Sequence, residues 1–203
     1  MRPSRRLLTA GLLALGAAAP ALVGAAAAPG PTDKVLGRAN ARVTVVEYAS
    51  VTCPHCADWH ETVWPRFKAK YVDSGKVRFV FRELTTEPVA WSNGGFMLAR
   101  CAPADRYFQV ISALFEHQAE LFATRDYPAW LAKAGAAGGL TEAQAQACTL
   151  SEKGLNELYA RMDASQKEHD VRSTPSFFVN DRPVGGDMAA LEAAIEPLLR
   201  ARR

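Results

Sequence analysis

Two cysteines separated by two residues are the most chemically informative feature of this sequence. The segment reads Cys53, Pro54, His55 and Cys56. A two-residue spacer brings both sulfur atoms within bonding distance, and the unpaired N–H groups and dipole of a helix start stabilise a thiolate on the first cysteine. The pattern therefore predicts a redox-active dithiol, with Cys53 as the reactive thiol and Cys56 as its shielded, resolving partner.

His55 lies between the two cysteines and is expected to influence the first of them. Its ring can donate a hydrogen bond or, when protonated, place a positive charge beside the Cys53 thiolate. Either interaction lowers the pKa of that thiol and makes its sulfur a better leaving group. The disulfide would then be the less stable state, which is the property of an oxidant.

A Cys-x-x-Cys pair has three other common uses. Attachment of a c-type haem needs histidine directly after the second cysteine, where this chain has Ala57, so haem is excluded. A zinc site needs two more ligands, and although His60 is within reach, Cys101 and Cys148 lack a paired spacing. A purely structural bridge across two residues gains little from loop closure. We therefore expect no metal and no cofactor.

The elements around the cysteine pair form a β-α-β pattern. A β-branched and aromatic run at 43–48 predicts a buried strand, and apolar residues at helical spacing over 56–71 predict a helix beginning at the cysteines. Pro65 falls inside this helical pattern and is expected to kink the helix or end its first half. A second strand follows at 77–82.

From about 88 to 169 the strand pattern disappears and several amphipathic helices follow one another. One is predicted over 107–122, and another carries Cys148 after a capping box that starts at Thr141. Two short strands around a turn at 180–181 and a terminal helix complete the chain. The sequence thus predicts an α/β fold in which an all-helical insertion separates a β-α-β half from a β-β-α half.

The N-terminal segment differs in composition from the rest of the chain. Three arginines precede an uncharged run rich in leucine, alanine and glycine, which is typical of an export signal. Its small residues predict cleavage after Ala27, so that 1–27 is a signal peptide and 28–203 the mature domain. Arg5 and Arg6 also resemble a twin-arginine signal. If it stayed uncleaved, the run would be long enough to anchor the chain in a membrane.

The overall composition is that of a globular protein. Of 203 residues, 49% are hydrophobic and 22% are charged, which excludes a disordered or fibrous chain. The three N-terminal arginines account for the formal net charge of +3, and no basic stripe follows them. We therefore expect no nucleic-acid partner. Four cysteines in an exported chain point to an oxidising compartment.

Together these motifs resemble the DsbA-like thiol:disulfide oxidoreductases of the thioredoxin fold. The resemblance rests on the Cys-x-x-Cys at 53–56, the helical insertion and the segment 174–180, and it covers nearly all of the mature chain. It implies a protein that introduces disulfide bonds into reduced exported proteins, with Pro54 and His55 as the tuning dipeptide. It also implies a DsbB-like membrane partner that reoxidises the pair, and a periplasmic or other extracytoplasmic location.

The resemblance assigns roles to residues outside the dithiol. Glu47, six residues before Cys53, matches a buried acid that assists proton transfer at Cys56. An ordinary strand-end carboxylate is the alternative. Pro175 matches a cis-proline whose loop faces the cysteines and, with the Thr174 backbone, pairs with a substrate peptide as an added strand. A turn proline is the alternative there.

The residue before this proline leaves the direction of the reaction open. The best-known oxidases of the family carry a branched aliphatic residue where this chain has Thr174, and threonine also occurs in isomerases. Dimeric isomerase relatives have an N-terminal dimerisation segment, whereas about 15 residues separate the expected cleavage point from the first predicted strand. A monomeric oxidase is therefore expected, with a reductase, an isomerase or a non-catalytic binding module as alternatives.

Cys101 and Cys148 form a second pair of a different kind. Both fall in the helical insertion, and neither has a Cys-x-x-Cys partner or lies at a helix start. If they are joined, closure of the loop between them would stabilise the folded chain by about 4 kcal/mol in the chain-entropy model. We expect a structural disulfide rather than a second redox site, and some DsbA-like proteins resemble this chain in having one in the insertion.

Overall fold

The computed structural model describes residues 29–201 and contains a five-stranded mixed sheet. The strands are β1 (Lys34–Leu36), β2 (Val43–Ala49), β3 (Val77–Glu83), β4 (Ser176–Val179) and β5 (Arg182–Val184). Their order across the sheet is β1-β3-β2-β4-β5. Strands β2 and β3 run parallel, and the other neighbouring pairs run antiparallel. The expected export signal, with its cleavage site after Ala27, lies outside the described residues.

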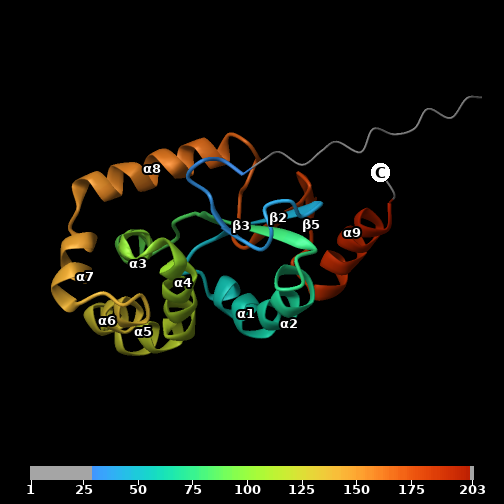
Figure 1. Ribbon diagram of the computed structural model, residues 1–203. Coiled ribbons are helices and arrows are strands. Elements are labelled where there is room, and N and C mark those ends of the chain that lie inside the picture. The colour runs from blue at the N-terminus through green and yellow to red at the C-terminus, as the bar shows by residue number, and fades with distance from the viewer. Residues whose placement is uncertain (1–28, 202–203) are drawn as a thin grey trace, which may run out of the picture.

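The helices form two groups (Figure 1). The first belongs to the two halves that build the sheet and comprises α1 (Pro54–Thr62), α2 (Trp64–Phe67), the π-helical turn Lys68–Val72 and α9 (Met188–Arg200). The second is the insertion and comprises α3 (Val89–Cys101), the short turn Ala104–Arg106, α4 (Tyr107–Glu116), α5 (Gln118–Thr124), α6 (Tyr127–Ala137), α7 (Glu142–Thr149) and α8 (Glu152–Gln166). Within the described residues, no helix combines the length and apolar composition that crossing a bilayer requires.

The predicted fold class is confirmed by this order of elements. The insertion lies between β3 and β4 and contains helices alone among its regular elements. Figure 1 shows α3 to α7 gathered to the left of the strands, α1 and α2 below them and next to α4, and α9 to the right. The β-α-β half and the β-β-α half therefore meet where β2 pairs with β4. No pattern in the sequence predicted that these two strands are neighbours.

Strand β2 is the centre of the fold, and every one of its residues is buried. Because successive side chains of a strand point to opposite faces, β2 contributes to two separate clusters. Val45 and Ala49 pack in the larger core with α1 and the insertion. Val46 and Tyr48 pack with Phe178 on the other face. Glu47 shares the face of Val45 and Ala49, so its carboxylate points toward the larger core.

The first strand was not predicted from the sequence. Residues 30–42 read as a polar approach, yet β1 pairs with β3 as an antiparallel edge strand, with Val35 opposite Val80. This strand has only three residues and none of them is fully buried. Three residues are too few for the alternation of apolar and polar positions that identifies a strand in a sequence.

The helix after the cysteines is divided where the proline predicts a break. Helix α1 ends at Thr62, and α2 begins at Trp64 with Pro65 in its first turn. Proline is tolerated there because the N–H groups of a first turn have no intrahelical acceptor. The expected end of the first half is confirmed.

The single helix predicted over 107–122 is wrong in one respect. The structure has two helices, α4 and α5, which meet at His117, where the backbone leaves helical geometry. Tyr107 and Leu114 are fully buried, as the apolar pattern predicts, but Phe122 is 38% exposed. The change of direction at His117 takes Phe122 away from the apolar stripe of α4.

Candidate active site

The first cysteine of the pair occupies the start of α1. Cys53 is the N-cap residue and Pro54 is the first residue of the helix. The Cys53 carbonyl accepts hydrogen bonds from the N–H groups of Cys56 and Ala57, at 3.1 and 3.2 Å. The backbone N–H groups of His55 and Cys56 in the first turn lie near the Cys53 sulfur, as the sequence pattern predicts.

The environment of Cys53 favours its thiolate. The pKa of this thiol is lowered from 9.0 to about 5, chiefly by the hydrogen bond that the Cys56 thiol donates to it. Burial opposes this shift, and hydrogen bonds from Thr174 and from the backbone N–H groups of Cys56 and His55 add to it. When protonated, the Cys53 thiol donates a hydrogen bond to the Thr174 carbonyl oxygen at 3.3 Å, and only 7% of the residue is exposed.

Cys56 has the opposite preference. It is fully buried, and burial is the main cause of the raised pKa of its thiol. The hydrogen bond that it donates to Cys53 and the negative charge of Glu47 raise the pKa further. In the dithiol form seen here, the pair therefore favours a thiolate at the slightly exposed Cys53 and a thiol at the fully buried Cys56.

The structure places Pro54 and the His55 ring at the surface. The contribution of His55 to the Cys53 thiolate comes from its backbone N–H group. An additional effect of the imidazole ring on Cys53 stays a prediction.

Glu47 lies in β2 and is completely buried. Both of its carboxylate oxygens are within hydrogen-bond distance of His60 Nε2, at 3.0 and 3.1 Å. Sequence reasoning considered His60 as a metal ligand and as a position on the helical stripe after the cysteines, and missed this contact. The spacing held a signal, because His60 and Cys56 are four residues apart on α1 and so share the face that covers β2. Among the described residues, no three His, Cys, Asp or Glu side chains gather into a metal site.

The loop before β4 brings Thr174 and Pro175 to the cysteines. The peptide bond between them is cis. Strand β4 pairs with β2 so that Ser176 lies opposite Tyr48 and Phe177 opposite Glu47. This register carries the preceding loop to the end of β2, where α1 starts.

Comparison with known proteins agrees with this geometry. The sequence model of the family described as thioredoxin matches residues 30–197. A Rickettsia bellii protein whose name designates a protein-disulfide oxidoreductase is 33% identical over 172 residues, which are 81% of this chain and 65% of that protein. The crystal structure of Wolbachia pipientis α-DsbA1 has a TM-score of 0.74 at 26% identity and covers 84% of this chain and 92% of that one. This chain belongs to the DsbA-like protein-disulfide oxidoreductases.

A further comparison defines the extent of the likeness. The crystal structure of BdbD from Bacillus subtilis has a TM-score of 0.71 at 19% identity and shares the fold. The match covers 83% of the present chain and 94% of the BdbD chain. The chain spans less than two thirds of the length of the rickettsial relatives, 65% of the Rickettsia bellii protein.

The insertion of this DsbA-like chain is tied to the active-site loop by Gln118, which sequence reasoning also missed. Gln118 lies at the start of α5 and is 3% exposed. Its Nε2 donates hydrogen bonds to the carbonyl oxygens of Val51 and Cys53, at 2.8 and 3.2 Å. A glutamine at an otherwise apolar helix position is a weak signal, and only the fold shows which carbonyl groups it reaches.

A cluster of hydroxyl groups holds the loop between β2 and α1. Ser50 Oγ lies 2.9 Å from the hydroxyls of both Ser92 and Thr86. Thr52 Oγ1 lies 2.9 Å from the Thr86 hydroxyl and 3.1 Å from its carbonyl oxygen. The side chains come from three separate segments, so the loop that positions Cys53 is fixed from several sides.

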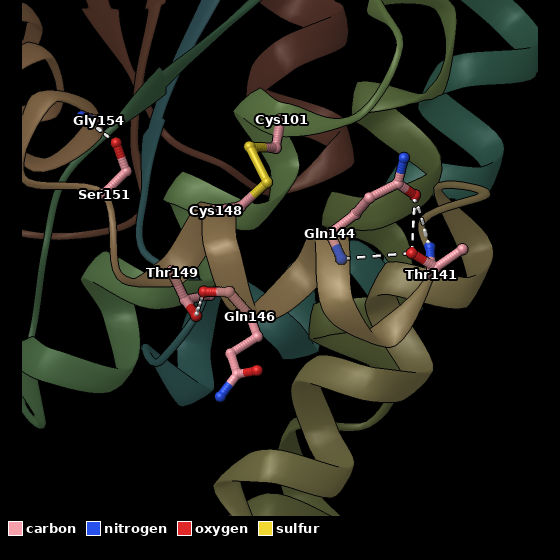
Figure 2. Close-up of a disulfide and its surroundings, with 8 residues drawn as sticks. All are labelled: Cys101, Thr141, Gln144, Gln146, Cys148, Thr149, Ser151 and Gly154. Carbon is pink, nitrogen blue, oxygen red and sulfur yellow. Dashed lines mark hydrogen bonds between the residues drawn. A yellow bond between two sulfur atoms is a disulfide. The ribbon is translucent and has the colours of Figure 1, made fainter.

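The second cysteine pair is joined by a disulfide in the insertion. Cys101 is the last residue of α3 and Cys148 lies near the end of α7, with their Cα atoms 6.0 Å apart. Figure 2 shows this bond, with the capping box of Thr141 and Gln144 at the opposite end of α7. The bond connects two helices of the insertion and includes neither Cys53 nor Cys56.

Proposed function

We propose that this DsbA-like protein is an exported dithiol oxidase that donates a Cys53–Cys56 disulfide to reduced proteins. The observation that carries the proposal is the opposite preference of the two sulfur atoms. Forming the disulfide consumes the stabilised Cys53 thiolate, so the environment that lowers the pKa of Cys53 also favours the reduced state. A disulfide that is less stable than its dithiol is an oxidant.

The proposed reaction begins when a substrate thiolate attacks Cys53 Sγ. A new sulfur–sulfur bond forms, the Cys53–Cys56 bond breaks, and its electron pair leaves with the Cys56 sulfur. The second thiolate of the substrate then attacks the mixed disulfide, and Cys53 leaves as a thiolate. The substrate has lost two electrons and the protein has gained two. Thr174 and the cis-proline at 175 would hold the substrate peptide as an added strand.

The setting of this activity is part of the same proposal. We expect the signal at 1–27 to be removed after Ala27 and residues 28–203 to act outside the cytoplasm as a monomer. Its substrates would be reduced exported proteins, and a DsbB-like membrane protein would reoxidise the pair. The three N-terminal arginines followed by an uncharged run support export.

The redox equilibrium of the mature chain with glutathione tests the direction of the reaction. A Cys101→Ser/Cys148→Ser variant isolates the active pair, and thiol labelling reports its state. We expect Cys53 and Cys56 to be reduced even in strongly oxidising glutathione mixtures. A pair that stays oxidised in reducing mixtures would instead identify a reductase or a structural bridge. Recovery of activity by a client protein with scrambled disulfides would support the isomerase alternative.

A further inference from the structure

A buried carboxylate–imidazole pair lies beneath the two cysteines. The side chains of Glu47 and His60 are 0% and 7% exposed, and their closest approach is 3.0 Å. The His60 ring stacks on Phe115 of α4, with ring centroids 4.2 Å apart and planes within 19°. It also meets the ring of Phe81 from β3 edge-on. The imidazole is therefore held in one orientation by apolar rings from two other elements.

The same imidazole borders a groove beside the active site. This groove lies between α1 and the α4–α5 pair, has a volume of about 690 Å³ and begins at Pro54. His60 forms part of its wall. The other ionisable residues that line it are Asp58, Glu61 and Glu116. His60 therefore separates the buried Glu47 carboxylate from solvent and contacts both.

The chemistry of Cys56 creates a need for a proton at this place. In the proposed reaction the Cys56 sulfur leaves with a negative charge inside the core, close enough to Glu47 for that carboxylate to oppose the charge. If Glu47 stayed negatively charged throughout, its charge would hinder the departure of the Cys56 thiolate. A route that brings a proton to Cys56 removes the charge as it forms.

We propose that His60 is a positioning residue that supplies the proton of Cys56 through Glu47 and recovers it from the groove. As the Cys53–Cys56 bond breaks, the Glu47 carboxylate receives one proton from His60 Nε2 and passes one proton to the Cys56 sulfur. The imidazolium becomes a neutral imidazole, Cys56 becomes a thiol, and the Glu47 carboxylate returns to its starting state. Water in the groove then reprotonates His60. In reoxidation of the pair, the same steps run in reverse.

The inference rests on the proposed function but concerns the rate of the thiol–disulfide step, whichever direction is favoured. Among residues 29–201, the ion-pair and ring contacts of the imidazole are with Glu47 from β2, Phe81 from β3, Phe115 from α4, and Trp59 and Trp64 from α1 and α2. Of these five side chains, Glu47 alone carries an acid–base group that can exchange a proton with the imidazole.

The test is single-turnover reduction of the oxidised protein by dithiothreitol between pH 4.5 and 8.5, with rates corrected for the dithiothreitol thiolate fraction. His60→Gln keeps a hydrogen-bond donor near Glu47 but does not titrate. We expect this variant to react at least about tenfold more slowly at pH 7 and to lose the pH inflection of the wild-type rate. His117→Gln, the same change at a histidine outside the groove, should match the wild type.

Two further variants separate a proton relay from a packing role. We expect Glu47→Gln to slow the reaction and the His60→Gln/Glu47→Gln double variant to be no slower than the slower single variant, because both act in one path. His60→Phe, which keeps the stack on Phe115, should be as slow as His60→Gln. A His60→Gln protein with the wild-type pH profile would overturn the proposal, as would full additivity of the two changes.

The glutathione equilibrium of the same variants keeps this test distinct from that of the proposed function. A relay slows both directions, so His60→Gln should change the equilibrium constant far less than the rate. If the wild-type equilibrium were that of a reductant, the oxidase proposal would fail while the rate comparison still decided the role of His60.

Discussion

The two cysteine pairs of this protein differ in where they lie on their helices. Cys53 caps the start of α1, where the helix dipole and the backbone N–H groups of the first turn favour a thiolate. Cys101 and Cys148 lie at or near the ends of α3 and α7, where unpaired carbonyl groups disfavour negative charge. The same side chain is thus suited to redox exchange at one helix end and to a lasting bridge at the other.

The pairs differ equally in the length of chain that they close. The bond between Cys101 and Cys148 joins residues 47 positions apart, whereas Cys53 and Cys56 are separated by two residues. Closing the long loop restricts the unfolded chain far more than closing the short one. The active pair can therefore open and close at little cost to the fold, and the insertion pair cannot.

The largest expected effect separates the two pairs by activity. Cys53→Ser removes the atom that a substrate thiolate attacks, so oxidation of a reduced dithiol peptide should fall to the uncatalysed rate. The Cys101→Ser/Cys148→Ser variant should retain the wild-type rate within about twofold, since its bond takes no part in the exchange. Peptide thiols remaining after timed mixing measure both. Substantial activity in Cys53→Ser would remove the distinction between the pairs.

Stability should depend on the insertion disulfide more than on the active pair, the reverse of the order expected for activity. Loss of the insertion disulfide in Cys101→Ala/Cys148→Ala should lower the free energy of unfolding by about 4 kcal/mol, from loop closure alone. Reducing only the active pair in the wild type should not produce this loss. Denaturant unfolding with the redox state of each pair checked by thiol labelling provides the measurement. Equal losses for the two pairs would contradict the loop-length argument.

The thiolate at Cys53 makes the stability of the reduced protein depend on pH. Because folding lowers the pKa of Cys53 from 9.0 to about 5, the unfolded chain binds more protons between these values, and stability rises with pH across them. The contribution is lost as pH falls through about 5. Relative to Cys53→Ser, reduced wild type should gain about 3 kcal/mol of stability between pH 4 and pH 7. Thermal unfolding from pH 4 to 8 tests this, and a difference that did not vary with pH would contradict the thiolate assignment.

A smaller effect on stability is expected where α5 of the insertion contacts the active-site loop. Gln118→Leu leaves the buried carbonyl groups of Val51 and Cys53 without this donor and should cost about 1 to 3 kcal/mol. Gln144→Leu, in the exposed capping box of α7, is a control that should cost less. Denaturant unfolding of both variants gives the comparison. If Gln118→Leu were as stable as the wild type, the insertion would not support the active-site loop through this contact.

Much of the fold could be predicted because its signals are local. The strand over 43–48, the helix start at the cysteines and the break before Pro65 each follow from residue types within a few positions. Strand β1 could not be predicted, because its three residues gain their conformation from pairing with β3. The break at His117 likewise depends on how α4 and α5 pack.

The sequence by itself determined the chemistry: a Cys-x-x-Cys at a helix start, an acid before it and an X-Pro segment before a late strand. Only the tertiary structure decided which groups surround that chemistry. His60 meets Glu47 because α1 crosses β2. Gln118 reaches Cys53 because α5 packs on the loop between β2 and α1. Thr174 reaches Cys53 because β4 pairs with β2. Backbone propensity acts over a few residues, whereas these contacts join positions up to 121 residues apart, and only packing of the whole chain brings them together.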